Sequence, residues 1–231
     1  MEFDRLDKLL STASAALSDA PPNSDSLFGG AIRHLYALLS RRNGFYAFES
    51  ALHVFPSGGP SLPGRSLEEW NEPRLWIDSY GELISPALFF AEDVFGGQFS
   101  IAGDTVLRFD PETAKSTEFA SGIEAWGAQV LAQYNFATGY SIAHAWQVEN
   151  GAIPVGHRLI PGIPFCVGGD FAVGNMVLVE SAAAMRYWGN FAKEIAQLPD
   201  GAQLRFNPAV IEGLRCAGSL RGDSSGCRCL D

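Results

Sequence analysis

Hydrophobic positions spaced three and four residues apart mark the helical parts of this chain. Such spacing predicts amphipathic helices over residues 3–18, over a segment that ends at residues 41–44, and over residues 181–198. The middle helix has a clear end, because two arginines lie in its last turn and a glycine that tolerates positive φ follows. Serine followed three residues later by glutamate, at Ser66 and at Ser121, predicts two further helix starts.

Between residues 87 and 120 the hydrophobic period changes from helical to extended. Short apolar runs are separated there by Gly-Gly and by an Asp-Pro-Glu-Thr turn, which is typical of an antiparallel meander rather than of a βαβ series. The predicted strands are residues 88–91, 98–101, 106–109 and 117–119. The pattern therefore predicts an α+β fold.

The second half of the chain gives weaker signals. Apolar runs predict three further strands, at residues 165–167, 175–179 and 204–206. The proline-rich residues 153–164 precede the first of these strands and are assigned to no helix or strand. Residues 209–231 are rich in Gly, Ser and Cys and have no period, so we expect a flexible tail. Residues 1–208 are then a single domain that begins with a helical segment.

Composition limits the class of protein. The 231 residues are 47% hydrophobic, which is enough for one sizeable core, and only 18% are charged, which argues against disorder. The acidic start of the chain does not resemble a secretory signal, and no apolar run reaches the roughly 18 residues of a membrane span. Three of the four cysteines lie in the last sixteen residues and give no disulfide framework. We therefore expect a cytoplasmic protein without a membrane partner.

Charge changes the expected partner. The chain carries a net charge of −10, and residues 43–185 hold 16 acidic and 5 basic side chains. A nucleic-acid binder needs the opposite sign, because its affinity comes from Lys and Arg at the phosphates. A basic protein is a plausible partner, since complementary fields speed association. The alternative is that the acidity serves only solubility.

Sequence motifs of known catalytic sites occur in the chain, but the partner residues that each motif requires are missing. Gly222-Asp-Ser-Ser-Gly226 has the spacing of a nucleophile elbow, but no histidine follows Ser224. Gly169 and Gly174 have the spacing of a phosphate-binding loop, but asparagine and methionine follow where lysine and Ser/Thr are required. The four histidines show no metal-binding spacing, so we expect no metal and no cofactor.

Two features keep an enzymatic alternative open. Glu92 and Asp93 follow an apolar strand, where two carboxylates can perform acid–base chemistry, although neighbours on a strand point to opposite faces. Cys166 lies in an apolar run, where thiols are usually inert, but it can pair with a histidine from elsewhere in the chain.

Two blocks of sequence carry a resemblance to a known family. Residues 89–99 read Phe-Phe-Ala-Glu-Asp-Val-Phe-Gly-Gly-Gln-Phe, and residues 109–113 read Phe-Asp-Pro-Glu-Thr, followed by a helix with Trp126. With residues 43–56 and 175–201, these blocks resemble the SUKH superfamily, a Smi/Knr-type family of bacterial immunity proteins and fungal regulators of cell-wall synthesis. The shared positions are mostly packing and turn residues.

The resemblance extends over about residues 25–208 and implies a fold and a function. The implied fold is a mixed, largely antiparallel sheet with helices packed on one side. The implied function is the tight binding and neutralisation of a cognate bacterial toxin, often a nuclease, without catalysis. The second hypothesis is an intracellular scaffold or regulatory protein-binding module, and the third is an unrecognised hydrolase that uses Glu92 or Cys166.

The leading hypothesis needs an acidic contact surface with an aromatic anchor. The candidate partner-binding residues are Glu68, Glu69, Trp70, Glu72, Glu92 and Asp93. Exposed carboxylates would steer a basic partner and a buried aromatic side chain would anchor it. The alternative for Trp70 is a place in the core.

Overall fold

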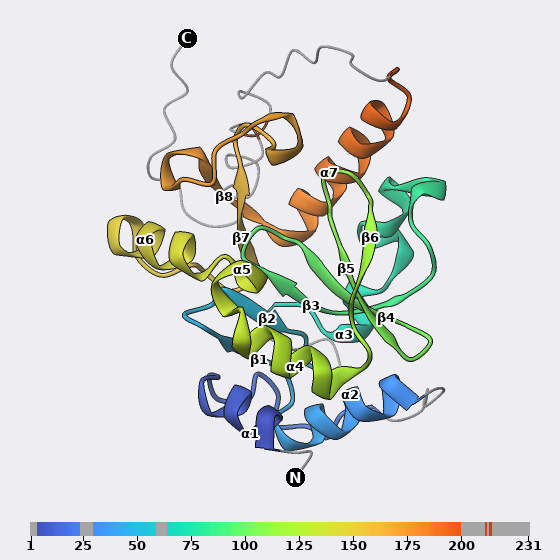
Figure 1. Ribbon diagram of the computed structural model, residues 1–231, viewed down its shortest axis with the longest axis vertical. Helices are drawn as coiled ribbons and strands as arrows, with labels where there is room; N and C mark the ends of the chain where they lie inside the picture. The colour runs from blue at the N-terminus through green and yellow to red at the C-terminus, as the bar shows by residue number, and fades with distance from the viewer. Residues whose placement is uncertain (1–3, 24–29, 59–63, 200–210, 212, 214–231) are drawn as a thin grey trace.

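A six-stranded antiparallel sheet forms the centre of the protein. The computed structural model describes residues 4–23, 30–58, 64–199, 211 and 213, and Figure 1 shows their arrangement. Each strand of the sheet pairs with the next strand in sequence. The strands are β1 (Phe45–Ala47), β2 (Leu52–Val54), β3 (Leu88–Asp93), β4 (Gln98–Ala102), β5 (Thr105–Phe109) and β6 (Ser116–Ala120). A second, two-stranded sheet pairs β7 (His157–Pro161) with β8 (Met176–Glu180).

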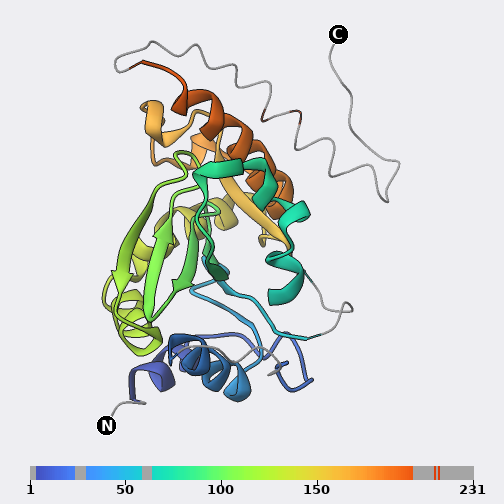
Figure 2. The same cartoon turned by 90° about the vertical axis from the view of Figure 1, so that its right-hand side faces the viewer.

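Helices cover both faces of the six-stranded sheet. The α-helices are α1 (Asp4–Ser11), α2 (Gly30–Arg41), α3 (Leu67–Trp70), α4 (Ile123–Ala132), α5 (Tyr134–Thr138), α6 (Tyr140–Asn150) and α7 (Ser181–Ala196). Short 3-10 helices are η1 (Pro73–Leu75), η2 (Ile77–Ser79), η3 (Gly81–Leu83), η4 (Phe165–Val167) and η5 (Val173–Asn175). Figure 2 shows α7 and the η1–η3 segment on one side of β3–β6 and α4 on the other. No helix in the described part of the chain combines the length and the apolarity that a bilayer span requires.

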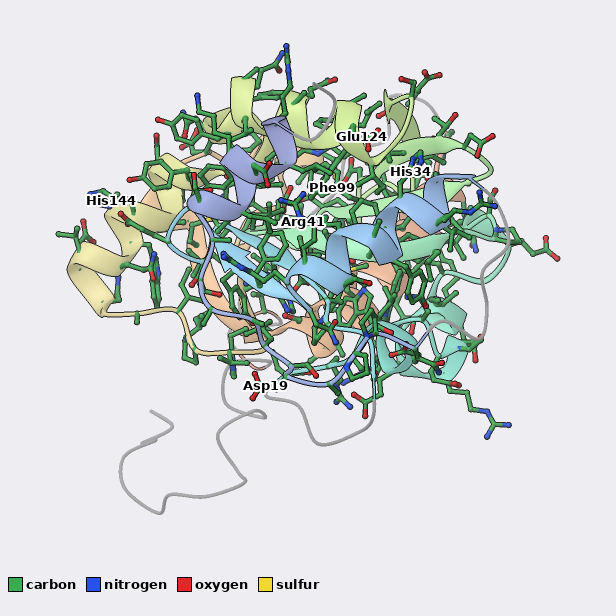
Figure 3. The ribbon with its side chains drawn as sticks, turned by 90° about the horizontal axis from the view of Figure 1, so that it is seen from below. Asp19, His34, Arg41, Phe99, Glu124 and His144 are labelled. Carbon is green, nitrogen blue, oxygen red and sulfur yellow. The ribbon has the colours of Figure 1, made fainter. Side chains whose placement is uncertain are left out.

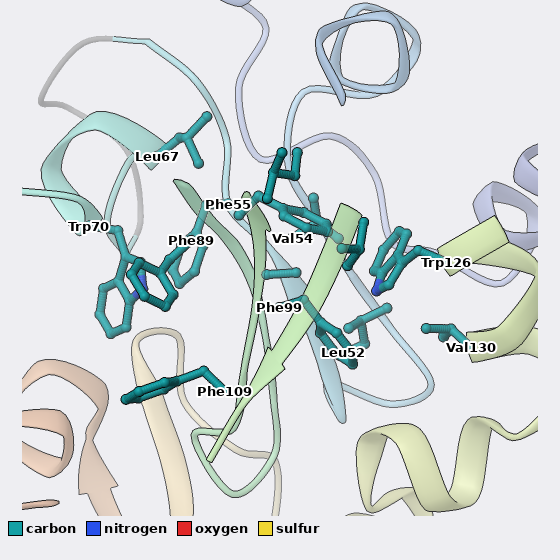
Figure 4. Close-up of a cluster of buried hydrophobic side chains, with 14 of the residues drawn as sticks. Leu52, Val54, Phe55, Leu67, Trp70, Phe89, Phe99, Phe109, Trp126 and Val130 are labelled. Atoms are coloured by element: carbon teal, nitrogen blue, oxygen red, sulfur yellow. The ribbon is translucent and has the colours of Figure 1, made fainter. Parts of the chain in front are cut away.

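Aromatic side chains fill the core on both faces of the sheet (Figure 4). On one face the Trp126 ring of α4 contacts the rings of Phe90 and Phe99, with centroids 5.1 and 5.8 Å apart. On the other face the Trp76 ring contacts Phe89 at 4.9 Å. Figure 3 shows the first face from below, with α1 and α2 lying across it and Phe99 behind them. Burial of these large apolar surfaces is the main force that holds the layers together.

The predicted α+β fold and the meander over residues 87–120 are confirmed. The fold implied by the resemblance differs in two details. All strand pairs between described residues are antiparallel, so the sheet is not mixed. Helices also cover two faces rather than one, because the adjacent side chains of Phe89 and Phe90 point to opposite faces and each needs apolar cover.

The first helix is shorter than predicted. It ends at Ser11 rather than at residue 18. Arg42 explains the difference, since its Nη1 donates to three carbonyl oxygens at and after the helix end, at 2.6–3.1 Å. The backbone N–H of Ser14 then donates to the carbonyl oxygen of Tyr46 at 2.7 Å, which lays this segment along β1. These tertiary hydrogen bonds outweigh the helical period of the sequence.

The region after α6 departs most from the predictions. Residues 157–161, within the proline-rich stretch for which no strand was predicted, form β7, and Pro161 is tolerated because it is the last residue of the strand. Residues 165–167, predicted to be a strand, form the single turn η4. The prolines before and after β7 therefore mark the ends of a strand and not a long loop.

The C-terminal predictions fall mostly outside the described residues. The predicted strand at 204–206 lies there, and so does most of the predicted tail, residues 209–231. Of that tail the structure describes Ile211 and Gly213, and Ile211 is fully buried in the main hydrophobic cluster. A wholly loose tail is therefore not what the described residues show.

The turn between β1 and β2 has an unusual backbone. Phe48, Glu49 and Ser50 have φ values of +53°, +52° and +69°. Left-handed backbone costs a residue other than glycine roughly 1–2 kcal/mol. Helix α6 holds the turn in place, because His144 Nδ1 lies 2.7 Å from Glu49 Oε2 and Gln147 Nε2 donates to the Glu49 carbonyl oxygen at 2.8 Å.

We expect Ser50→Gly to stabilise the protein. Glycine adopts positive φ without a steric penalty, and its greater freedom in the unfolded chain offsets only part of this gain. The net increase in unfolding free energy should be about 1 kcal/mol, which corresponds to a rise of roughly 2–4 °C in Tm. The control is Ser85→Gly, at an exposed position with ordinary backbone, which should leave Tm unchanged or lower it. A lower Tm for Ser50→Gly would contradict the strain argument.

Candidate functional site

An open groove of about 750 Å³ lies where four segments of the chain meet. These segments are the β3–β4 turn, the end of β5, the junction of α5 with α6, and the loop around η4. The lining residues are Asp93, Phe95, Gly97, Arg108, Phe109, Asp110, Pro111, Glu112, Asn135, Phe136, Gly139, Ser141, Ile142, Phe165, Cys166 and Phe171. Most of the lining is apolar or aromatic, as in binding sites generally.

The β3–β4 turn forms the floor of the groove. Asp93 Oδ1 accepts hydrogen bonds from the backbone N–H groups of Phe95 and Gly97, at 2.9 and 2.8 Å. A Cβ at Gly97 would lie 2.5 Å from Asp93 Oδ2, so this close approach requires glycine. Asp93 Oδ2 also forms an ion pair with Arg108 Nη2 of β5 at 2.7 Å. The Asp-Val-Phe-Gly-Gly sequence thus fixes both the turn and its link to β5.

The Asp110-Pro111-Glu112 turn holds the opposite wall. The carboxylate of Glu112 accepts the backbone N–H groups of Phe165 and Cys166, at 3.0 and 2.8 Å, and so ties the η4 loop to the end of β5. Asp110 accepts the backbone N–H of Glu112 at 3.0 Å and remains exposed. Two sequence blocks, residues 89–99 and 109–113, therefore come together at one site.

Aromatic side chains form the rim. Phe165 and Phe171 are stacked with ring centroids 3.7 Å apart, and Phe95 meets Phe165 edge-on at 5.4 Å. Phe171 is 65% exposed, and Phe136, which also lines the groove, is 76% exposed. Single exposed apolar residues are common, but exposed aromatic residues gathered around a hollow indicate an interaction site.

The ionisable groups of the groove are already engaged by the protein. Burial raises the pKa of Asp93, although Arg108 opposes this effect. Burial likewise raises the pKa of Glu112, although the amides of the η4 loop oppose it. Burial and the neighbouring Glu112 raise the pKa of the Cys166 thiol to about 12, so Cys166 is protonated at neutral pH. A protonated thiol is a poor nucleophile, which disfavours a hydrolase based on Cys166.

The structure separates the predicted partner-binding residues. Trp70 is fully buried against Phe55, so the prediction that it anchors a partner is wrong and the core alternative is correct. Glu92 and Asp93 are also buried, at 1% exposure each, and cannot form part of an acidic outer surface. They are the last two residues of β3, and they are buried because that strand is covered on both faces. Asp93 nevertheless lies in the groove floor.

The three glutamates around α3 have local roles or remain free. Glu69 completes the capping box with Ser66, which confirms the predicted helix start. Glu68 accepts the Ser57 hydroxyl at 2.6 Å and is partly buried. Glu72 is exposed. Of the six candidate residues, Glu72 is therefore the one whose side chain is exposed to a partner.

Glu92 belongs to a buried polar cluster on the other side of the sheet from Asp93. Its Oε1 lies 3.1 Å from His53 Nδ1 of β2 and 2.8 Å from Arg158 Nη2 of β7. The second contact is an ion pair without the alignment of a hydrogen bond. Ser181, at the start of α7, approaches the same oxygen at 3.5 Å. The cluster joins the small β7–β8 sheet to the main sheet.

The charges within this cluster are mutually compensated. Burial acts to raise the pKa of Glu92, but Arg158 and His53 outweigh it, so the pKa lies below its ordinary value. Burial lowers the pKa of His53 by more than Glu92 raises it, so the imidazole is neutral at pH 7. A carboxylate fixed in an ion pair cannot readily accept a proton from a substrate, which disfavours Glu92 as a general base.

We expect stability to fall as the pH is lowered from 7.5 to 5.5. Because the folded pKa of His53 is depressed, the unfolded chain binds a proton below pH 6.5 that the folded chain does not. The loss attributable to His53 should approach about 1 kcal/mol at pH 5.5. The depressed pKa of Glu92 acts in the same direction, below about pH 4.5. The raised pKa values of Asp93 and Glu112 act in the opposite direction.

Urea unfolding at the two pH values checks this prediction. The variant His53→Gln keeps a hydrogen-bond donor for Glu92 but removes the titrating group. The difference in pH dependence between wild type and variant isolates the His53 contribution from that of the carboxyls. Equal pH dependence in both proteins would contradict the assignment.

Within the described residues, no group of three or more His, Cys, Asp or Glu side chains is arranged to hold a metal ion. The fold and the groove thus define an α+β protein with an open, aromatic-rimmed hollow. No family model matches the chain, and no curated protein matches it. Among solved structures it is similar to Atu4351 from Agrobacterium tumefaciens, with a TM-score of 0.52 and 11% identity over 81% of this chain and 88% of that chain. At this identity the likeness shows a shared fold alone.

Most of the groove was not predictable from the sequence. Phe136 and Phe171 were assigned no role, and Arg108 was placed only on a strand. The available signal was the pair of blocks at residues 89–99 and 109–113, whose turns both line the groove. Their convergence depends on the antiparallel pairing of β3, β4 and β5, which spacing along the chain does not reveal.

Proposed function

We propose that this chain is a cytoplasmic binding protein that neutralises a cognate bacterial toxin by covering its active surface, without catalysis of its own. The groove is the observation that carries the proposal. The Phe136 and Phe171 side chains expose large apolar surfaces to water, which does not stabilise the protein by itself. A bound partner would bury these surfaces. The resemblance to the SUKH superfamily supports a toxin as the partner.

The charge distribution supports a basic partner. The groove lining contains three carboxyl groups and one guanidinium group, and the guanidinium of Arg108 already pairs with Asp93. The surrounding segment, residues 43–185, has 16 acidic and 5 basic side chains. Such a field accelerates association with a positively charged protein and opposes association with nucleic acid.

Co-expression with the product of the adjacent gene tests the proposal. We expect the wild-type chain to restore growth of cells that produce this toxin and to form a stoichiometric complex with it in size-exclusion chromatography. A variant with unchanged fold but a weakened groove, Phe136→Ala with Phe171→Ala, tests the site. No protection by the wild-type chain would overturn toxin neutralisation. Several weak partners in place of one tight partner would instead favour a scaffold.

A further inference from the structure

The groove has two chemical parts that lie next to each other. The apolar part consists of the stacked Phe165 and Phe171 rings and of Phe136, which lines the same groove. An apolar side chain bound there would contact these aromatic rings and lose part of its exposure to water. Aromatic and long aliphatic side chains gain most from such burial.

The polar part is acidic, and one of its carboxylates is accessible. Glu112 is occupied by the amides of the η4 loop, and Asp93 is occupied by Arg108. Asp110 is exposed, and its oxygens accept the Glu112 amide and the Thr113 hydroxyl. A carboxylate has about four acceptor sites, so Asp110 retains capacity for a cation from outside the chain.

We infer that the groove recognises a protein segment in which one large apolar side chain is adjacent to a lysine or arginine. This inference rests on the proposed function and adds the chemistry of what is bound. The apolar side chain lies between Phe136 and Phe171, and the cation approaches Asp110. Charge complementarity selects this occupant, because the lining contains three carboxyl groups and its guanidinium is engaged. The same charges repel phosphate-rich ligands such as nucleic acid and anionic lipid.

Short peptides test the inference without knowledge of the partner. The probe is acetyl-Gly-Lys-Phe-Lys-Gly-amide, compared with peptides in which glutamate replaces both lysines or alanine replaces phenylalanine. Binding is followed by NMR shifts of backbone amides, with Gly97 and Gly139 as reporters because both line the groove. We expect the Lys-Phe-Lys peptide to bind at least about fivefold more tightly than either comparison peptide.

Variants of the protein test the contributions of the apolar part and the acidic part of the groove separately. Phe136→Ala combined with Phe171→Ala should weaken the Lys-Phe-Lys peptide about tenfold, and both positions are exposed enough to leave the fold intact. Asp110→Asn should weaken the binding of the Lys-Phe-Lys peptide about threefold and make that binding less dependent on salt concentration. Binding of the glutamate peptide should change only by the loss of its repulsion from Asp110. The matched control is Val148→Ala on α6, which removes an equally exposed apolar side chain outside the groove.

Several outcomes overturn the inference. The inference is wrong if the glutamate peptide binds as tightly as the Lys-Phe-Lys peptide, or if the NMR shifts are confined to residues outside the groove. It is also wrong if the double phenylalanine variant binds the Lys-Phe-Lys peptide as tightly as the wild type does. Failure of this inference is distinguishable from failure of the proposed function. If a toxin binds the wild type and the double phenylalanine variant equally, the proposal of toxin neutralisation stands, but the groove is not the binding site. If the peptides bind as expected but the wild-type chain gives no protection against the toxin, the inferred groove chemistry is supported and the proposal of toxin neutralisation is overturned.

Discussion

Arg158→Met should lower the free energy of unfolding by about 3–5 kcal/mol. Arg158 and Glu92 are each 1% exposed, and the Nη2–Oε1 distance is 2.8 Å. Removal of the guanidinium leaves the buried carboxylate of Glu92 without its counter-ion, with His53, Ser181 and Gln98 as polar neighbours. The cost of a buried charge without a counter-ion far exceeds that of a lost surface ion pair. Urea unfolding at pH 7 measures the effect through the transition midpoint.

A second substitution separates the loss of the charge pair from the loss of packing. Glu92→Leu combined with Arg158→Met replaces both charges with apolar groups and should recover at least about 2 kcal/mol relative to Arg158→Met alone. Arg65→Met is the matched control, because the Arg65 side chain is 43% exposed and lies 3.9 Å from Glu180. That control should change stability by less than about 0.5 kcal/mol. A double variant less stable than the single variant would show that Glu92 stabilises the fold through its other contacts, with His53 and Ser181, and not mainly through Arg158.

Trp70→Ala should destabilise the protein by about 3–5 kcal/mol. The Trp70 ring is fully buried, stacks on Phe55 with centroids 4.7 Å apart, and donates from Nε1 to Gln98 Oε1 at 2.9 Å. Truncation therefore creates a large cavity and leaves the buried amide oxygen of Gln98 without its donor. Thermal or urea unfolding measures the loss directly.

Two companion variants make the Trp70 result specific. Trp70→Phe retains most of the ring but removes the donor, and should cost about 1–3 kcal/mol. Glu72→Ala, at an exposed position with no side-chain capping hydrogen bond, should cost less than about 0.5 kcal/mol. If Trp70→Ala left stability unchanged but weakened partner binding, Trp70 would be an interface residue and its core assignment would be incorrect.

Much of the fold was predictable because local and tertiary preferences agree there. The meander over residues 87–120 combines apolar runs with Gly-Gly and Asp-Pro turns, and these signals all favour the same structure. The predicted length of the first helix was too great because Arg42, distant in sequence, donates to the carbonyl oxygens of Leu10, Ala13 and Ser14 at and after the helix end. The strand β7 was missed because prolines at its borders are also typical of loops.

The candidate site was less predictable, for reasons that lie in geometry. Acidic residues near an aromatic side chain suggested a contact surface, but a sequence does not reveal which carboxylates are buried. Glu92 and Asp93 are adjacent in sequence and enter separate environments, with Arg158 on one face of the sheet and Arg108 on the other. Phe136 and Phe171 come together only through the helices and loops that follow the sheet.

The irregular segment after α1 has a consequence for solubility. A sheet that does not close on itself presents two lateral rows of unpaired amide and carbonyl groups, which can recruit strands from other molecules. On the β1 side, Ala13 bridges to Ala47 and Ser14 bonds to Tyr46, so part of that row is covered from within the chain. On the β6 side, Glu118 and Lys115 place charges along the row. Each border is thus shielded against intermolecular β-pairing, one by the protein's own backbone and the other by charge.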